Sequence, residues 1–309
     1  METIIKATGL VKQFKDVRAV DDLSFTVQKG EIYGFLGQNG AGKSTTIRML
    51  LSLVKPTSGS IQLFGKDLAS ARSAILQSTG AVIEKPDLYK YLTGAENVSI
   101  FARLSGLRLT AGEINRKLES VGLGTRTNSK VKTYSQGMKQ RLGIAVALVH
   151  DPDMVILDEP ANGLDPQGIA DMRNLILHLG RDLKKTVMVS SHLLSETEQI
   201  ADRLLIIDNG KKIVEGKMSE LMDRSKMLLE LSTGNNEAAL QLIETFPDIK
   251  FVRKDKNKLI LEVSETQIPV LVRHLVNNNI DVISVDSRHS LENYFLALTA
   301  QGHVVTSAN

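Results

Sequence analysis

The sequence predicts a large α/β domain followed by a smaller α+β domain, and three observations lead to this expectation. Short apolar runs alternate with amphipathic helical patterns through the first two thirds of the chain, which is the rhythm of a sheet with helices on both faces. After Gly216 the pattern changes to the order β-α-β-β-α-β, which predicts a second domain from about residue 222. The length of 309 residues is also about twice that of an average domain.

Composition and charge exclude several classes of protein. The chain has 0 cysteines, which excludes disulfide scaffolds, Cys-ligated metal sites and Cys nucleophiles and favours a cytosolic location. A formal net charge of +3 is too small to indicate a nucleic-acid or membrane-surface binder. The longest stretch free of Asp, Glu, Lys and Arg, residues 293–309, is broken by polar side chains, so we expect no membrane span. The N-terminus lacks the apolar region of a secretory signal.

The first domain is expected to begin with extended segments at 3–8 and 17–28, and the apolar run EIYGFL at 31–36 is typical of a buried strand. Helical spacing begins at Lys43 and ends before Lys55 and Pro56. The same two patterns predict later strands at 79–83, 154–157, 186–190 and 203–207, and helices at 138–150, 166–180 and 193–201. These elements make up the predicted sheet and its covering helices.

Residues 93–121 depart from this alternation because they have helical spacing without an intervening strand. They predict a helical insertion at about 85–150. The elements expected after Gly216 are strands at 228–232, 251–252, 258–263 and 280–285, and helices at 238–246 and 270–278. This is the element order of a ferredoxin-like domain. The expected domains are therefore 1–221 and 222–309.

The first candidate site is the segment GQNGAGKS at 37–44, which satisfies the pattern G-x-x-x-x-G-K-[ST]. The pattern would occur by chance about 0.01 times in a chain of this length. It lies between a predicted strand and a predicted helix, so loop N–H groups and the helix N-terminus would converge on an anion. The three glycines leave room for a phosphate, Lys43 would neutralise the β- and γ-phosphates, and Ser44 would ligate Mg²⁺.

The second candidate site is the apolar strand MVILDEP at 154–160, which ends in two adjacent carboxylates. Adjacent residues of a strand point to opposite sides, so we expect Asp158 to face Mg²⁺ and Glu159 to face an attacking water. An apolar strand followed by Asp-Glu is common and indicates little by itself. Together with the phosphate loop it predicts phosphoryl transfer, which needs a metal-binding carboxylate and a group that positions the nucleophile.

Over about residues 3–220, the chain resembles the ATP-binding subunit of an ABC transporter. GQNGAGKST is similar to the family's Walker A motif, and MVILDE is similar to its Walker B motif. YSQGMKQR at 134–141 resembles the signature sequence, usually LSGGQ, while NGLD at 162–165 resembles the D-loop and SSH at 190–192 contains the switch His. Phe14 falls where the family has an aromatic ring that stacks on adenine.

The resemblance implies a role for each motif. The residues implied in nucleotide binding are Phe14, Gly37, Gln38, Asn39, Gly40, Ala41, Gly42, Lys43, Ser44 and Thr45. The implied metal ligands are Ser44, Asp158 and Glu84. The implied catalytic residues are Glu159 and His192; His192 would hydrogen-bond the γ-phosphate and hold the attacking water together with Glu159. The residues implied in contacts across a dimer are Ser135, Gln136, Gly137 and Met138 of the signature and Asn162 and Asp165 of the D-loop.

Two of these motifs have features of their own. Ser135 precedes the predicted helix at 138–150 and is a candidate N-cap, so the N-terminus of that helix could receive a phosphate. The family normally has Gln at the end of the segment GAVIE (80–84), where this chain has Glu84. A carboxylate would bind Mg²⁺ but would add negative charge beside the phosphates. With Glu at this place, the segment resembles exporters associated with bacteriocin or lantibiotic self-protection and bacitracin resistance.

The sequence therefore predicts an ATPase subunit of an ABC exporter that uses ATP and Mg²⁺. The resemblance implies that two copies, or this chain and a paired ATPase subunit, close head to tail on two ATP molecules. They would drive separate transmembrane permease subunits from the inner face of the cell membrane, as cytoplasmic peripheral proteins with no nucleic-acid partner. The alternative is a soluble ABC ATPase that acts on ribosomes or nucleic acid, although translation-factor relatives carry two sets of motifs and this chain has one.

Overall fold

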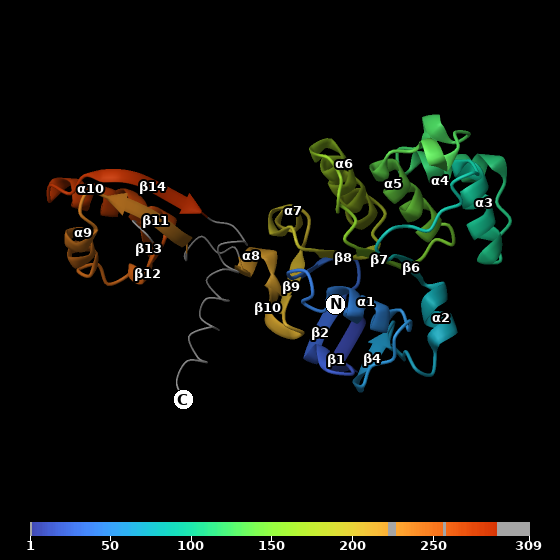
Figure 1. Ribbon diagram of the computed structural model, residues 1–309, viewed down its shortest axis with the longest axis horizontal. Helices are drawn as coiled ribbons and strands as arrows, with labels where there is room; N and C mark the ends of the chain where they lie inside the picture. The colour runs from blue at the N-terminus through green and yellow to red at the C-terminus, as the bar shows by residue number, and fades with distance from the viewer. Residues whose placement is uncertain (1, 222–226, 256–257, 289–309) are drawn as a thin grey trace. The chain divides into compact units, whose positions relative to one another are not determined.

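The computed structural model describes residues 2–221, 227–255 and 258–288. The chain forms two compact units, one up to Gly216 and one from Lys217 on, which are described separately here (Figure 1). The second domain expected from the sequence includes residues 222–226, 256–257 and 289–309, which lie outside the described residues.

Six strands form the central sheet of the first unit, in the order β10-β9-β3-β8-β7-β6. They are β3 (Ile32–Leu36), β6 (Thr79–Val82), β7 (Met154–Asp158), β8 (Thr186–Ser191), β9 (Arg203–Asp208) and β10 (Lys211–Lys217). Neighbouring strands from β9 to β6 are parallel. All but β10 confirm predicted apolar runs. The sequence does not predict β10 because none of its residues is buried, so it has no apolar run.

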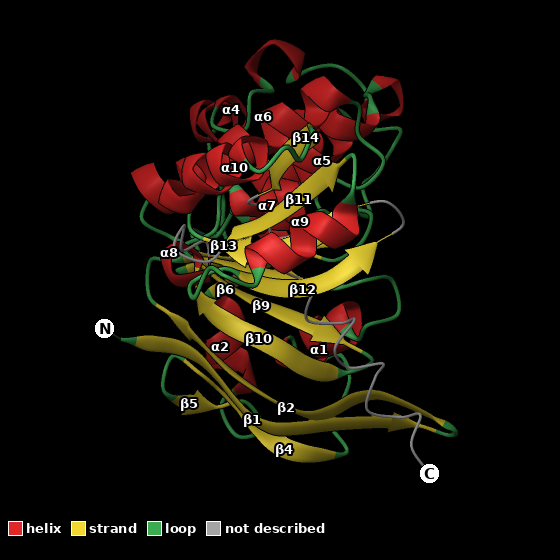
Figure 2. Cartoon of the chain, turned by 90° about the vertical axis from the view of Figure 1, so that its left-hand side faces the viewer, coloured by secondary structure: helices red, strands yellow, loops and turns green. Residues whose placement is uncertain are grey.

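A second, antiparallel sheet lies beside the central one, in the order β2-β1-β4-β5 (Figure 2). Its strands are β1 (Thr3–Phe14), β2 (Val17–Gln28), β4 (Ser58–Leu63) and β5 (Lys66–Asp67). The two long strands confirm the predicted extended segments. The two short ones are not predicted, because β4 buries only Ile61 and Leu63 and β5 buries neither of its residues.

Seven α-helices connect the strands of this unit: α1 (Lys43–Leu50), α2 (Arg72–Gln77), α3 (Gly94–Leu104), α4 (Ala111–Glu119), α5 (Gln136–Ala147), α6 (Pro166–Leu177) and α7 (Leu194–Glu198). The two helices predicted within 93–121 are confirmed as α3 and α4, and each begins with a capping box. The helix predicted at 166–180 changes to a π-helical turn at His178–Asp182. Within the described residues, no helix has the length and hydropathy of a membrane span.

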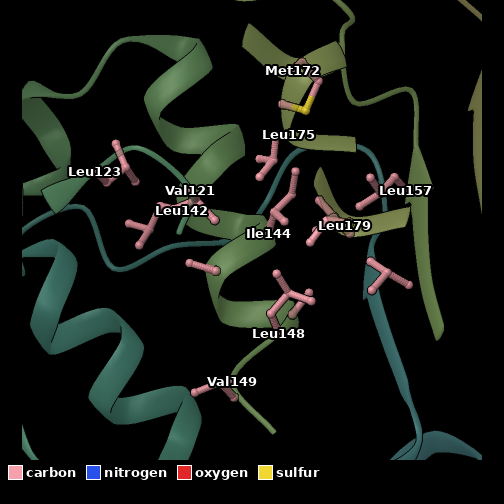
Figure 3. Packing of buried hydrophobic residues seen from close by; sticks show 14 of the residues in the cluster. Val121, Leu123, Leu142, Ile144, Leu148, Val149, Leu157, Met172, Leu175 and Leu179 are labelled. Carbon is pink, nitrogen blue, oxygen red and sulfur yellow. The ribbon is translucent and has the colours of Figure 1, made fainter. Parts of the chain in front are cut away.

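The central sheet separates two hydrophobic cores because its middle strands, β3, β7 and β8, are buried on both faces. Along β7, Met154 and Ile156 pack toward α1 and the antiparallel sheet, whereas Val155 and Leu157 pack toward α3, α4, α5 and α6. Figure 3 shows the second core, in which side chains of α5 and α6 meet Leu157. Figure 1 shows the corresponding layers on either side of the sheet. This packing holds the end of β7, where Asp158 lies, inside the molecule.

The second unit confirms the predicted β-α-β-β-α-β order. After the short α8 (Met218–Leu221), its elements are β11 (Met227–Thr233), α9 (Asn236–Ile243), β12 (Lys250–Asp255), β13 (Lys258–Val263), α10 (Ile268–Asn277) and β14 (Val282–Arg288). The sheet is antiparallel, in the order β12-β13-β11-β14, so the first and third strands are central, as in a ferredoxin-like domain. Its core contains Leu229, Leu231 and Leu261 of the sheet and Leu271 and Leu275 of α10.

Candidate active site

The loop of residues 37–42 connects β3 to α1 and packs tightly against β2 and β9. A Cβ atom at Gly37 would lie 2.5 Å from the carbonyl oxygen of Ile207, and one at Gly42 would lie 2.4 Å from that of Ala19. Gly42 also has a φ of 104°, which favours glycine. The close packing leaves the other side of the loop open, and its exposed residues are Gln38, Asn39 and Gly40.

Lys43 begins α1 and is only 6% exposed. Its Nζ donates hydrogen bonds to the carbonyl oxygens of Gly37 (2.7 Å) and Gln38 (3.2 Å). The same Nζ forms an ion pair with Glu159 Oε1 at a distance of 3.1 Å. The geometry of this contact does not meet the criteria for a hydrogen bond. The ammonium group therefore lies between the phosphate loop and the end of β7. Ser44 and Thr45 follow it in the first turn of α1.

Asp158 is the last residue of β7 and is 1% exposed. Its Oδ1 accepts a hydrogen bond of 2.5 Å from Ser190 Oγ on the neighbouring strand β8. Its Oδ2 is buried and has no hydrogen-bond partner among the described residues. A buried carboxylate oxygen without a protein donor is costly, and a cation or its water ligand would satisfy it.

Glu159 leaves the strand, because its φ is 50°, so the alternation expected for adjacent strand residues does not apply to it. Its main-chain N–H lies 2.9 Å from Ser190 Oγ and 3.2 Å from the Ser190 carbonyl oxygen. Its Oε2 lies 2.7 Å from His192 Nδ1. Asp158 and Glu159 thus line the same pocket, contrary to the expectation of opposite sides, although their contacts differ.

That pocket has a volume of about 760 Å³. The residues that line it are Ser44, Glu84, Lys85, Gln136, Gln140, Asp158, Glu159, Asn162 and Gly163. The three expected metal ligands thus lie at one pocket, together with Glu159. The described residues contain no group of three or more His, Asp or Glu side chains that could hold a metal ion by themselves.

Glu84 lies at the edge of this pocket and is exposed. Its carboxylate forms an ion pair with Arg48, which is one helical turn after Ser44 on α1. The φ of Glu84 is 55°, so the chain turns sharply at the end of β6. The carboxylate expected to bind metal is therefore also within reach of a guanidinium group, which partly offsets its negative charge.

The signature segment begins α5, and Ser135 is its N-cap as predicted: Ser135 Oγ accepts a hydrogen bond of 3.2 Å from the N–H of Met138. The helix begins at Gln136, two residues before the predicted start. The preceding Tyr134 is buried and donates a 2.7 Å hydrogen bond to the carbonyl oxygen of Arg126. Burial raises the pKa of Tyr134, so the hydroxyl keeps its proton and its role as a donor.

Signature and D-loop residues also lie together, in a second pocket of about 400 Å³ whose lining includes Ser135, Gln136, Gly137, Gly163 and Asp165. Asp165 caps α6 by accepting a 2.8 Å hydrogen bond from the N–H of Gly168. Phe14 lies apart from both pockets. It is 45% exposed at the end of β1, with Lys12 Nζ 4.8 Å from the centre of its ring.

Three residues that contact the site are not predicted from the sequence. Ser190 contacts both Asp158 and Glu159, and Arg48 pairs with Glu84. Gln140 is buried and lines the larger pocket, and its Oε1 has no hydrogen-bond partner within the part of the chain that the structure describes. Ser190 is the first residue of the segment SSH (190–192), in which the family resemblance assigns a role only to His192. Arg48 and Gln140 belong to helices, where such residues are common, so no local signal distinguishes them.

Comparisons with known proteins agree with this geometry. The sequence pattern described as ABC transporter matches residues 20–162. The chain is 44% identical over 306 residues to the bacitracin transport ATP-binding protein BcrA of Bacillus licheniformis, covering 98% of this chain and 100% of that protein. It is 34% identical to the linearmycin resistance ATP-binding protein LnrL of Bacillus subtilis (strain 168), with coverage of 96% and 99%. A solved structure of an ATP-binding subunit of an ABC transporter is 30% identical, with a TM-score of 0.61, over 71% of this chain and 92% of that one.

The contacts of Ser190 predict that Ser190→Ala slows ATP hydrolysis without weakening ATP binding. The variant removes the hydrogen bond that Ser190 Oγ donates to the Asp158 carboxylate and the one that it accepts from the main-chain N–H of Glu159. Hydrogen bonds to charged groups contribute about 1.5–3 kcal/mol, so turnover should fall at least about tenfold. Phosphate release at saturating ATP measures turnover, and fluorescent-nucleotide titration measures affinity.

The neighbouring serine supplies the control for this prediction. Ser191 Oγ accepts a 2.9 Å hydrogen bond from the N–H of Leu193, so Ser191→Ala removes a hydroxyl of the same strand without touching either carboxylate. Equal turnover of the Ser190→Ala and Ser191→Ala variants would contradict a positioning role for Ser190.

Proposed function

The chain belongs to the ABC transporter family as an ATP-binding and ATP-hydrolysing subunit, and from this premise we propose that it powers an exporter through separate membrane subunits. The observation that carries the proposal is the meeting of Lys43, Glu159 and His192 at one edge of the central sheet. The export direction is supported by relatives whose names describe bacitracin transport and linearmycin resistance.

ATP binds, in this proposal, with its phosphates at residues 37–45, which are the loop after β3 and the start of α1. Loop N–H groups and the N-terminus of α1 attract the negative charge, and the Lys43 ammonium exchanges its carbonyl partners for phosphate oxygens. Phe14 stacks on the adenine ring. Its exposure of 45% leaves a ring face accessible, as stacking requires.

Magnesium is the metal that fits these residues. Ser44 and Asp158 would hold it, and the observation that supports the fit is the buried Asp158 Oδ2, which has no partner among the described residues. When bound, Mg²⁺ neutralises phosphate charge and so favours the transfer. Glu84 would contribute from the edge of the pocket, with Arg48 limiting the charge that it adds beside the phosphates.

Glu159 is the residue proposed to orient the attacking water. Its carboxylate is held from two directions, by Lys43 at 3.1 Å and by His192 at 2.7 Å, so its position does not depend on one flexible side chain. His192 also contacts the γ-phosphate in this proposal, which places the water between a base and the phosphorus atom that it attacks.

Two such chains, or this chain and a paired ATPase subunit, close on two ATP molecules. The signature of one subunit then faces the phosphate loop of the other, and Ser135, Gly137 and the first turn of α5 meet the γ-phosphate. This role suits the N-terminus of a helix, which carries a partial positive charge. The D-loop residue Asp165 lines the smaller pocket and Asn162 lines the larger one, and Gln136 of the signature lines both, so in this proposal both segments reach the partner together.

The remaining parts of the chain are assigned as follows. Residues 1–221 form the ATP-binding domain, and the helical insertion at about 85–150 passes motion to the permease subunits. Residues 222–309 form an accessory domain. The chain works in the cytoplasm, on the inner face of the cell membrane, where the permease subunits hold it, and it needs no nucleic acid.

We expect Glu159→Gln to bind ATP normally and to hydrolyse it at least about 100-fold more slowly, since an amide cannot take up the proton of the attacking water. ATP that is not hydrolysed should keep two subunits together, so size-exclusion chromatography with ATP should show a dimer. Glu119→Gln, at an exposed position at the end of α4, is the matched control. Hydrolysis by Glu159→Gln at the rate of this control would refute the assignment of Glu159.

The transport role predicts a membrane partner. An affinity-tagged chain expressed together with its neighbouring genes should copurify, from detergent-solubilised membranes, with a hydrophobic protein of several spans. The ATPase rate of that complex should exceed the rate of the isolated chain. Copurification with ribosomes or DNA instead would favour the soluble alternative and contradict the proposal.

A further inference from the structure

Gln136 connects the signature segment to the D-loop within one chain. Its Nε2 donates a 3.0 Å hydrogen bond to the main-chain carbonyl oxygen of Asn162. Because a carbonyl oxygen can only accept, the amide nitrogen of Gln136 must be the group that faces it. The side chain lies at the start of α5, and Asn162 belongs to the turn that leads from Glu159 to α6.

The turn that receives this hydrogen bond is shaped to admit the Gln136 side chain. Gly163 has a φ of 72°, and a Cβ atom at this position would lie 2.8 Å from Gln136 Nε2. A residue with a side chain would therefore be strained at position 163 and would also push the amide away. The glycine and the glutamine fit each other, and both line the two pockets described above.

From Asn162 the contacts continue to the proposed catalytic carboxylate. The N–H of Asn162 donates a 3.1 Å hydrogen bond to the carbonyl oxygen of Glu159, which closes the turn between them. The Glu159 carboxylate in turn contacts Lys43 and His192. The start of α5 is thus joined to Glu159 by two successive hydrogen bonds, one from the Gln136 side chain to the main chain of Asn162 and one between the main chains of Asn162 and Glu159.

Few side chains could make the first of these bonds at position 136. A glycine, which is usual in the sequence that this segment resembles, has no side chain to reach the turn. A methionine reaches equally far but has no donor, and a glutamate of the same shape has only acceptors when ionised. Glutamine is long enough, uncharged and a donor, so its presence here gives this chain an additional contact.

We propose that Gln136 is a positioning residue that fixes the D-loop turn, and through it Glu159, to the start of α5 in the same subunit. Its side chain acts through the main chain of Asn162 and not through contact with the nucleotide. It makes the signature and the D-loop of one subunit move as one body toward the partner. The proposal rests on the role of Glu159 given under the proposed function.

The test compares Gln136→Met with the unmodified chain in two measurements. Hydrogen–deuterium exchange without nucleotide should show the main-chain N–H of Asn162 exchanging about fivefold faster in the variant. This is the effect expected when the turn loses one neutral hydrogen bond. At saturating ATP, turnover should fall by a similar factor while the KM for ATP stays within about twofold, because the phosphate loop is untouched. Gln136→Glu should show at least the same changes, since two acceptors would face each other.

Gln199→Met is the matched control. Gln199 is also exposed, and its Nε2 also donates a 3.0 Å hydrogen bond to a main-chain carbonyl oxygen, that of Ser195 within α7. This variant should leave Asn162 exchange and turnover unchanged. Unaltered Asn162 exchange in Gln136→Met, or a rise in KM as large as the fall in kcat, would overturn the proposal. An unmodified chain without ATPase activity would instead contradict the proposed function.

Discussion

The site depends on the register of three adjacent parallel strands, β3, β8 and β7. Leu36 pairs with Ser191, and Asp158 pairs with Ser190, so all three strands end at one level. The phosphate loop follows the first strand, His192 follows the second, and Glu159 follows the third. A shift of one residue in either pairing would separate Lys43, Glu159 and His192, which come from distant parts of the sequence.

Burial of the three strands stabilises this register, and polar contacts at the strand ends add to it. The three strands are buried on both faces, so their carboxyl ends cannot move independently of the two cores. Ser190 Oγ joins the end of β8 to the Asp158 carboxylate and to the main-chain N–H of Glu159. The ammonium group of Lys43 lies beside these strand ends, where it contacts two loop carbonyl oxygens and the Glu159 carboxylate. A phosphate group is a stronger partner for the ammonium than a neutral carbonyl, so we expect ATP binding to influence the position of Glu159 through Lys43.

Local patterns in the sequence predict the parts of the site that depend on neighbouring residues. The strand, glycine-rich loop and helix around Lys43, the N-cap Ser135 and the buried end of β7 are of this kind. The outward turn of Glu159, the bridge by Ser190 and the hydrogen bond from Gln136 to Asn162 depend on residues that only the fold brings together. Strands such as β4 and β10 are not predicted for a related reason: they complete sheets by main-chain pairing and bury few side chains.

The most direct test of this account is a structure of the chain with Mg²⁺ and a non-hydrolysable ATP analogue. The account predicts that Lys43 Nζ leaves the carbonyl oxygens of Gly37 and Gln38 for phosphate oxygens, and that the γ-phosphate lies beside Glu159 and His192. Asp158 and Ser44 should then hold the metal. A triphosphate bound away from Glu159, with Lys43 still on the two loop carbonyls, would contradict the account.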